Sequence, residues 1–76
     1  MKKLKLGKYQ HYKGGMYEVL GVVHHSESLE ELVLYKQLYV SNFPIGTLWV
    51  RPLKMFLESV ELDGKKVPRF KYLGEQ

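Results

Sequence analysis

Most of the chain alternates apolar and polar residues with a period of two, which indicates β-strands. The first such run, residues 8–13, is rich in tyrosine and ends at the diglycine 14–15. A diglycine between two β-like runs is typical of a hairpin, and the return strand covers residues 16–27. Gly21 lies in the middle of this strand, where glycine commonly marks a bulge or a sharp bend. The pattern therefore predicts a hairpin whose second strand is long and bent.

The middle of the chain repeats this organisation. A polar turn over residues 26–30 leads into an apolar strand over residues 31–40. Residues 41–46 contain Asn, Pro and Gly, which is typical of a loop, with Phe43 exposed at its tip. Residues 47–51 then form another strand, which ends at Pro52 because proline cannot donate a hydrogen bond to a ladder.

After Pro52 the period changes. Leu53, Phe56, Leu57 and Val60 follow the spacing i, i+3, i+4, i+7, which predicts a helix of about two turns. Pro52 suits its first position. The Asp-Gly pair at 63–64 then predicts a second hairpin. Pro68 lies inside the last apolar run, which places that strand at a sheet edge.

These elements predict an all-β fold of five or six short antiparallel strands with one short helix after Pro52. We expect a small SH3-like barrel, since closure removes most free strand edges in a chain of 76 residues. The whole chain, 1–76, forms a single domain, because a second domain would lack a core of its own. Residues 1–6 are expected to be a flexible basic leader and residues 74–76 a loose tail.

Composition narrows the range of functions. The chain has no cysteine, so neither disulfides nor thiolate chemistry is available. Its formal net charge is +4, with lysine and arginine concentrated near the two ends. This distribution favours either an anionic partner or a solvated basic surface. No apolar run approaches the roughly 18 residues of a membrane span or follows the first lysines as in a signal peptide, so we expect a cytoplasmic protein with no membrane contact.

Five segments together resemble a family of small bacterial proteins known only as a domain of unknown function. They are GKYQHYKGGMYEV from Gly7, HSES from His25, ELVLYKQLY from Glu31, LWVRPLKMF from Leu48 and PRF from Pro68. The resemblance covers nearly the whole chain and implies no established activity, so it supplies no catalytic residues. The family pattern has threonine where this chain has Ser28, which preserves the hydroxyl group.

The resembling pattern contains polar side chains that core packing does not require. They are His11, Lys13, His25, Glu27, Arg51 and Arg69. Polar residue types of this kind point to surface recognition or to turn structure rather than to the core.

His25 and Glu27 form the first candidate for chemistry. Spaced at i, i+2 on a strand, they share a face and could supply half of a metal site. Ser26 and Ser28 add the residue types of a catalytic triad, but neighbours in one turn cannot be arranged as nucleophile, base and orienting group. We therefore favour a turn in which Glu27 or Ser28 holds loop amides and His25 orients the turn. No metal, cofactor or catalytic residue is expected.

Trp49 and Arg51 form the second candidate. On a strand they share one face with Thr47, whereas Leu48 and Val50 share the other. We expect Leu48 and Val50 to point inward, which leaves the indole half exposed beside the guanidinium. Trp and Arg are enriched at binding hot spots. The alternative is a buried Trp49, with Arg51 paired to a nearby carboxylate.

In that alternative the partner of the guanidinium is either Glu27 or Glu18.

With Trp49 and Arg51 pointing outward, the strand could instead form part of a groove. If Tyr35 or Tyr39 lies on the adjacent strand, this groove is aromatic and has a cation at its rim. The sequence thus favours a non-catalytic binding module for a peptide or a small anionic ligand. A nucleic-acid-binding protein is the alternative, since such a groove also stacks bases. The expected site comprises Trp49, Arg51, Tyr35 and Tyr39, with Tyr12, His25 and Glu27 nearby.

Overall fold

A computed structural model describes residues 4–74, which form seven strands and one short helix. The elements are β1 (Gly7–His11), β2 (Met16–His24), β3 (Glu31–Gln37), β4 (Leu48–Pro52), α1 (Leu53–Phe56), β5 (Ser59–Leu62), β6 (Lys65–Pro68) and β7 (Phe70–Gly74). All strand pairs are antiparallel. The predicted all-β class with one short helix after Pro52 is confirmed, but residues 4–74 contain seven strands rather than the expected five or six.

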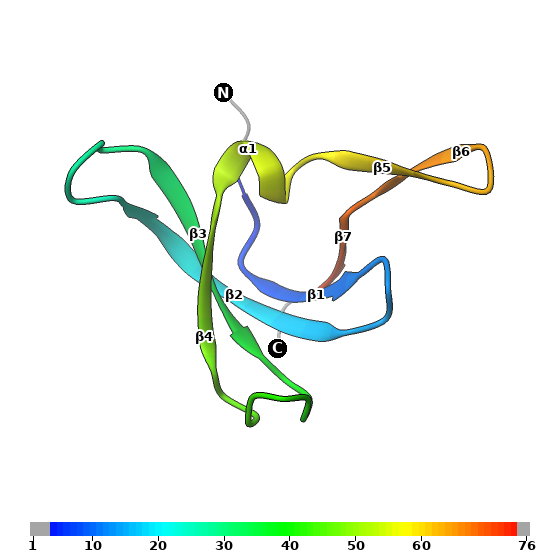
Figure 1. Cartoon of the computed structure of the whole chain (residues 1–76), viewed down its shortest axis with the longest axis horizontal. Coiled ribbons are helices and arrows are strands. Elements are labelled where there is room, and N and C mark those ends of the chain that lie inside the picture. Colours follow the sequence, from blue (N-terminus) through cyan, green and yellow to red (C-terminus); the bar gives the residue numbers. More distant parts are fainter. Residues whose placement is uncertain (1–3, 75–76) are drawn as a thin grey trace.

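The strands form two sheets. Five of them lie in the order β4-β3-β2-β1-β7, and β5 pairs with β6 alone. In Figure 1 the large sheet curves strongly, so that β4 runs across the direction of β1. Within the described residues β4 and β7 are the two edges of this sheet and do not pair with each other. The expected closed SH3-like barrel is therefore not confirmed, and the sheet is open.

Strand β2 contains a bulge or irregularity near Gly21. The register between β2 and β3 shifts between Val19 and Gly21, as the mid-strand glycine predicted. On the other side of β2, β1 pairs Tyr9 with Tyr17 and Gln10 with Met16. The hairpin at the diglycine therefore forms, and its tip stands beside the hollow side of the sheet (Figure 1).

The second predicted hairpin also forms, but the chain after its turn differs from the expectation. Asp63 and Gly64 both have positive φ, 52° and 77°, as the two central residues of a type I′ turn require. The last apolar run is not one edge strand, because β6 ends at Pro68 and β7 begins at Phe70. Arg69 separates them, and its backbone N–H donates to the carbonyl oxygen of Glu58 at 3.0 Å.

Helix α1 is a single turn rather than the expected two, because β5 already begins at Ser59. Its function in the fold is to insert Phe56, which is 1% exposed, into the core. The Phe56 ring stacks on Phe70 of β7 with centroids 4.1 Å apart. Residues 4–74 contain no helix that is long and apolar enough to cross a membrane.

The core lies on the hollow side of the large sheet. Its buried side chains are Tyr9, Val19, Val33, Tyr35, Phe56 and Phe70. Leu4 packs against this core, so part of the expected leader contacts the fold, and Gly74 pairs with Lys8. The rest of the expected leader and tail falls partly on residues 1–3 and 75–76, which lie outside the described residues.

The face assignment of β4 was wrong. Trp49 lies opposite Tyr35 and Arg51 opposite Val33 in the β3–β4 register, so both side chains point to the core side of the sheet. Leu48 and Val50, the expected inward pair, are 57% and 53% exposed. The reason is that β3 buries Val33 and Tyr35, and pairing forces the matching residues of β4 onto the same face.

Candidate functional site

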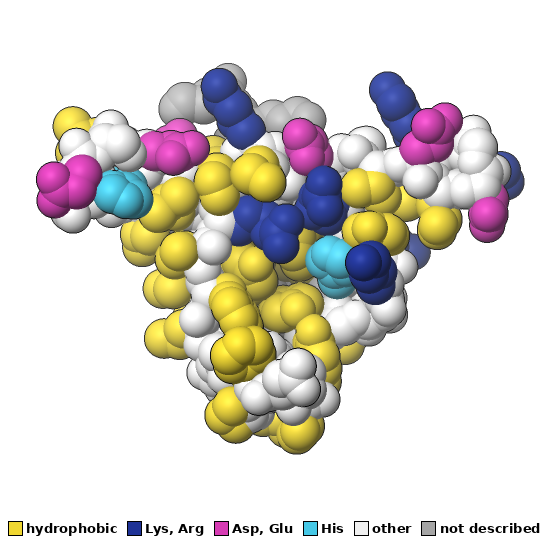
Figure 2. Space-filling view, in the orientation of Figure 1, with side chains coloured by type: hydrophobic (Ala, Val, Ile, Leu, Met, Phe, Trp, Pro, Cys, Tyr) yellow, Lys and Arg dark blue, Asp and Glu magenta, His cyan; other side chains and the backbone are white. Residues whose placement is uncertain are grey.

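A pocket of about 480 Å³ opens on the hollow side of the sheet beside the β1–β2 hairpin. We call it the aromatic–basic pocket. Its side-chain walls are the rings of Tyr17, Tyr35, Tyr39 and Phe70 together with His11, Lys13, Met16 and Arg51. Figure 2 shows this face: lysines, arginines and a histidine gather at its centre, above a hydrophobic region that extends to the lower tip.

Arg51 reaches across the core side of the sheet to β7. Its Nε donates a hydrogen bond to the Tyr35 hydroxyl oxygen at 3.3 Å, and its guanidinium carbon lies 5.5 Å from the Phe70 ring centroid. These two contacts orient a planar group that prefers carboxylate or phosphate as a partner. The sequence suggested that Tyr35 lies near Arg51, but it did not reveal the contact with Phe70, because Phe70 is far away along the chain.

No carboxylate neutralises Arg51 within residues 4–74. Their ion pairs join Lys36 to Glu18 at 3.4 Å and Arg69 to Glu58 at 3.1 Å. Of the two partners suggested for Arg51, Glu18 is thus taken by Lys36, and Glu27 lies in the distant β2–β3 turn. The alternative in which a local carboxylate holds Arg51 is wrong for the described part of the chain.

Two tyrosines close one side of the pocket. The hydroxyl oxygens of Tyr17 and Tyr39 lie 2.6 Å apart, and their rings meet edge to face. Burial raises the pKa of Tyr17, and its hydrogen bond with Tyr39 raises it further. Tyr17 consequently stays protonated at neutral pH and adds no negative charge to the pocket.

His11 adds a neutral imidazole to a positive surrounding. Its Nδ1 accepts the backbone N–H of Lys13 at 3.1 Å, so the proton of the neutral ring is on Nε2. Burial lowers the pKa of His11, and the charges of Arg51, Arg69 and Lys13 lower it further. The same field that disfavours a proton on His11 favours an anion beside it.

Trp49 supports the site without lining the pocket. Its indole N–H donates to Oε1 of Gln37 at 3.1 Å. Gln37 is 2% exposed, and its Nε2 donates to the carbonyl oxygens of Tyr39 and Phe43. The ring of Phe43, exposed in its loop as predicted, meets Trp49 edge to face at 4.9 Å. Trp49 therefore holds the chain around Tyr39 in place.

His25 and Glu27 lie away from the pocket. They belong to the β2–β3 turn, at the opposite corner of the sheet from the β1–β2 hairpin (Figure 1). His25 Nδ1 accepts the backbone N–H groups of Glu27 at 3.1 Å and Ser28 at 3.3 Å. A hydrogen-bonded turn forms, as we favoured from sequence, but His25 itself holds two of the loop amides, and Ser28 Oγ accepts the backbone N–H of Glu30 at 3.2 Å. Across residues 4–74 no three His, Asp or Glu side chains gather as metal ligands would.

The structure thus brings together Tyr35, Tyr39 and Arg51 of the expected site. Tyr12 lies just across the β1–β2 hairpin, its ring 4.7 Å from that of His11. Sequence reasoning missed Tyr17 and Phe70 as pocket residues, and it noted His11 and Lys13 only as polar members of the resembling pattern. A usable signal was the alternation of β2, which places Tyr17 on the same face as buried Val19.

Fold and site together define a small all-β protein with an open, strongly curved sheet and an aromatic–basic pocket on its hollow side. The chain belongs to the DUF1653 family of proteins of unknown function, whose model matches residues 7–72. This supports the resemblance found from sequence.

A solved structure supports the same assignment. The chain is similar to the crystal structure of a DUF1653 protein from Bordetella bronchiseptica, with 32% sequence identity and a TM-score of 0.87. The alignment covers 97% of this chain and 92% of the other. None of the curated proteins matches the chain.

Proposed function

We propose that this protein is a non-catalytic binding module whose aromatic–basic pocket takes the carboxylate or phosphate group of a ligand. The observation on which this rests is the state of Arg51. Its guanidinium is oriented by Tyr35 and Phe70 at the pocket wall, and no acidic side chain among the described residues pairs with it. A positioned, unneutralised guanidinium is a binding group for an oxyanion.

The surroundings of Arg51 support an anion rather than a cation. Lys13 also lines the pocket, Arg69 lies close enough to lower the pKa of His11, and no Asp or Glu among residues 4–74 contributes to the lining. His11 adds a neutral donor, and Tyr17 and Tyr39 supply hydroxyl groups. An anion in this pocket would therefore meet several donors and one fixed charge.

The arrangement of the rings favours a small ligand group over a nucleic-acid base. Phe70 is stacked on Phe56 and has the Arg51 guanidinium 5.5 Å from its ring centroid, so the ring already has two close partners. Tyr17 meets Tyr35, Tyr39 and Phe70 edge to face. Base binding requires free ring faces for stacking. The rings of this pocket instead pack against one another.

The experiment titrates the protein with inorganic phosphate, with acetate and with a short acetylated peptide that has a free carboxylate. NMR would follow the Arg51 Nε–H signal and the pKa of His11. Because a bound anion offsets the neighbouring positive charges, we expect the pKa of His11 to rise on binding. Arg51→Met should weaken binding by roughly tenfold or more, and Arg51→Lys by less, since lysine keeps the charge but not the planar fork.

Lys54→Met is the matched control, because Lys54 is exposed on α1 and does not line the pocket. It should bind like the unaltered protein. Thermal unfolding of each variant would show that the fold persists. If no anion shifts the Arg51 and His11 signals, or if Arg51→Met binds equally well, the proposal is wrong. Binding to a short single-stranded RNA that weakens steeply with salt would favour the nucleic-acid alternative instead.

A further inference from the structure

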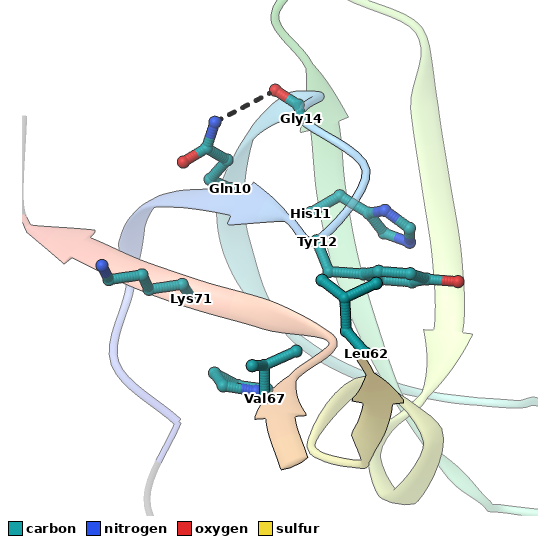
Figure 3. Close-up of a pocket in the computed structure, with 8 residues that line it drawn as sticks. Gln10, His11, Tyr12, Gly14, Leu62, Val67 and Lys71 are labelled. Atoms are coloured by element: carbon teal, nitrogen blue, oxygen red, sulfur yellow. Dashed lines mark hydrogen bonds between the residues drawn. The ribbon is translucent and has the colours of Figure 1, made fainter. Parts of the chain in front are cut away.

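A second pocket lies on the other side of the β1–β2 hairpin. It has a volume of about 430 Å³ and opens between this hairpin, β7 and the β5–β6 hairpin (Figure 3). We call it the apolar pocket. His11 and Gly14 line both pockets, so only the hairpin tip separates them. The two pockets are therefore neighbouring subsites rather than independent cavities.

The walls of the apolar pocket suit an aliphatic group. Leu62 and Val67 come from the β5–β6 hairpin, Pro68 follows Val67, and Tyr12 comes from the β1–β2 hairpin. In Figure 3 the Tyr12 ring lies against the imidazole of His11, and their ring centroids are 4.7 Å apart. His11 thus covers one face of the ring, and Tyr12 and Leu62 are both walls for aliphatic contact.

Polar groups at the rim of the apolar pocket suit a peptide backbone. The Nε2 of Gln10 donates to the carbonyl oxygen of Gly14 at 3.3 Å, and Figure 3 shows its amide oxygen turned away from this bond. That oxygen is an acceptor for a peptide N–H. Lys71 adds a positive charge, and no acidic residue lines the apolar pocket among the described residues.

We propose that the ligand is the carboxyl end of a peptide, whose terminal carboxylate binds Arg51 while an apolar side chain near that terminus fills the apolar pocket. This inference rests on the proposed function, because it needs the anion at Arg51. The two groups can belong to neighbouring residues of one peptide, because His11 and Gly14 line both pockets. The apolar pocket then determines which peptides bind.

The test compares three acetylated tripeptides by calorimetry: Gly-Leu-Leu with a free carboxylate, the same peptide as its carboxyl-terminal amide, and Gly-Gly-Gly with a free carboxylate. The free leucine peptide should bind about tenfold more tightly than either of the others, since burial of one leucine and one charge-assisted contact are each worth about that factor. Arg51→Met should weaken binding of both free peptides.

Leu62→Thr is the decisive variant. It should weaken binding of the leucine peptide by roughly fivefold or more and leave Gly-Gly-Gly unchanged, because only the former reaches the apolar pocket. Leu73→Thr is its matched control: both leucines are 45% exposed, but Leu73 lines neither pocket. Unfolding midpoints near that of the unaltered protein would show that Leu62→Thr still folds.

The outcomes separate this inference from the proposed function. If both free tripeptides bind equally and only Arg51→Met weakens them, the inference is overturned while the anion site stands. If octanoate binds as tightly as the leucine peptide, the peptide class is overturned. If no probe binds in an Arg51-dependent way, both proposals are wrong.

Discussion

Gly15 lies directly beneath the ring of Tyr39. A β-carbon built at position 15 would lie 2.7 Å from Cε1 of that ring and 2.9 Å from its hydroxyl oxygen. The same hydroxyl shares a 2.6 Å hydrogen bond with Tyr17. Because Gly15 has no side chain, the ring of Tyr39 can lie against the β1–β2 hairpin and close one side of the aromatic–basic pocket.

Gly15→Ala should displace Tyr39 and destabilise the protein by about 1–3 kcal/mol, the usual cost of overpacking. The pKa of Tyr17 should also fall, because the bond from Tyr39 contributes to its raised value. Urea unfolding measures the first effect, and tyrosinate absorbance in an alkaline titration measures the second.

Gly21→Ala is the control for this substitution. A β-carbon there meets no atom of residues 4–74 within 4 Å, and the residue does not have the positive φ that makes alanine strained. It should cost no stability, and the reduced freedom of the unfolded chain predicts a small gain. Equal effects of the two substitutions would contradict the contact between Gly15 and Tyr39.

The lowered pKa of His11 predicts how stability depends on pH. Below the ordinary value of 6.5 the unfolded chain takes up the proton first, while burial and the charges of Arg51, Arg69 and Lys13 resist protonation in the fold. The contribution of His11 is thus complete above pH 6.5 and is lost progressively as the pH falls toward the folded-state value. Urea unfolding in chloride buffers, from about pH 8 to about pH 5, measures this slope.

His11→Asn provides the comparison. Its side-chain oxygen can still accept the N–H of Lys13, but it does not titrate, so the slope in this pH window should become shallower than in the unaltered protein. An unchanged slope would show that His11 does not titrate differently in the folded and unfolded states.

The face assignment of β4 predicts opposite results at neighbouring positions. Trp49→Phe removes the donor to Oε1 of buried Gln37 and should cost about 1–3 kcal/mol, the penalty of an unsatisfied buried acceptor. Leu48→Thr should change the free energy of unfolding by no more than about 0.5 kcal/mol, because Leu48 is largely exposed. Chemical denaturation of both variants tests the pair, and a larger loss at Leu48 would reverse the assignment.

Local signals predicted most elements of the fold. The diglycine and Asp-Gly turns, the bulge at Gly21 and the helix after Pro52 each depend on residues close together in sequence. Strand β4 shows what such local signals cannot predict, namely which face of a strand is buried. Its apolar residues occupy both faces, so alternation alone could not decide whether Trp49 or Leu48 points inward, and pairing with β3 did.

The candidate site divides in the same way. Tyr35, Tyr39 and Arg51 were expected together because β3 and β4 are neighbours along the chain. Tyr17 and Phe70 were missed, because the contact of Phe70 with Arg51 requires the curved sheet to bring its last strand near β4.

By itself the sequence determined the all-β class, the turns and a cationic, aromatic-rich composition, because backbone preference, turn chemistry and charge are properties of residues and their near neighbours. Only the tertiary structure decided that the sheet stays open, that Trp49 binds Gln37, and that Arg51 faces a pocket free of acidic side chains in the described part of the chain. The physical reason is that face and neighbour depend on strand pairing and sheet curvature, which join residues far apart along the chain.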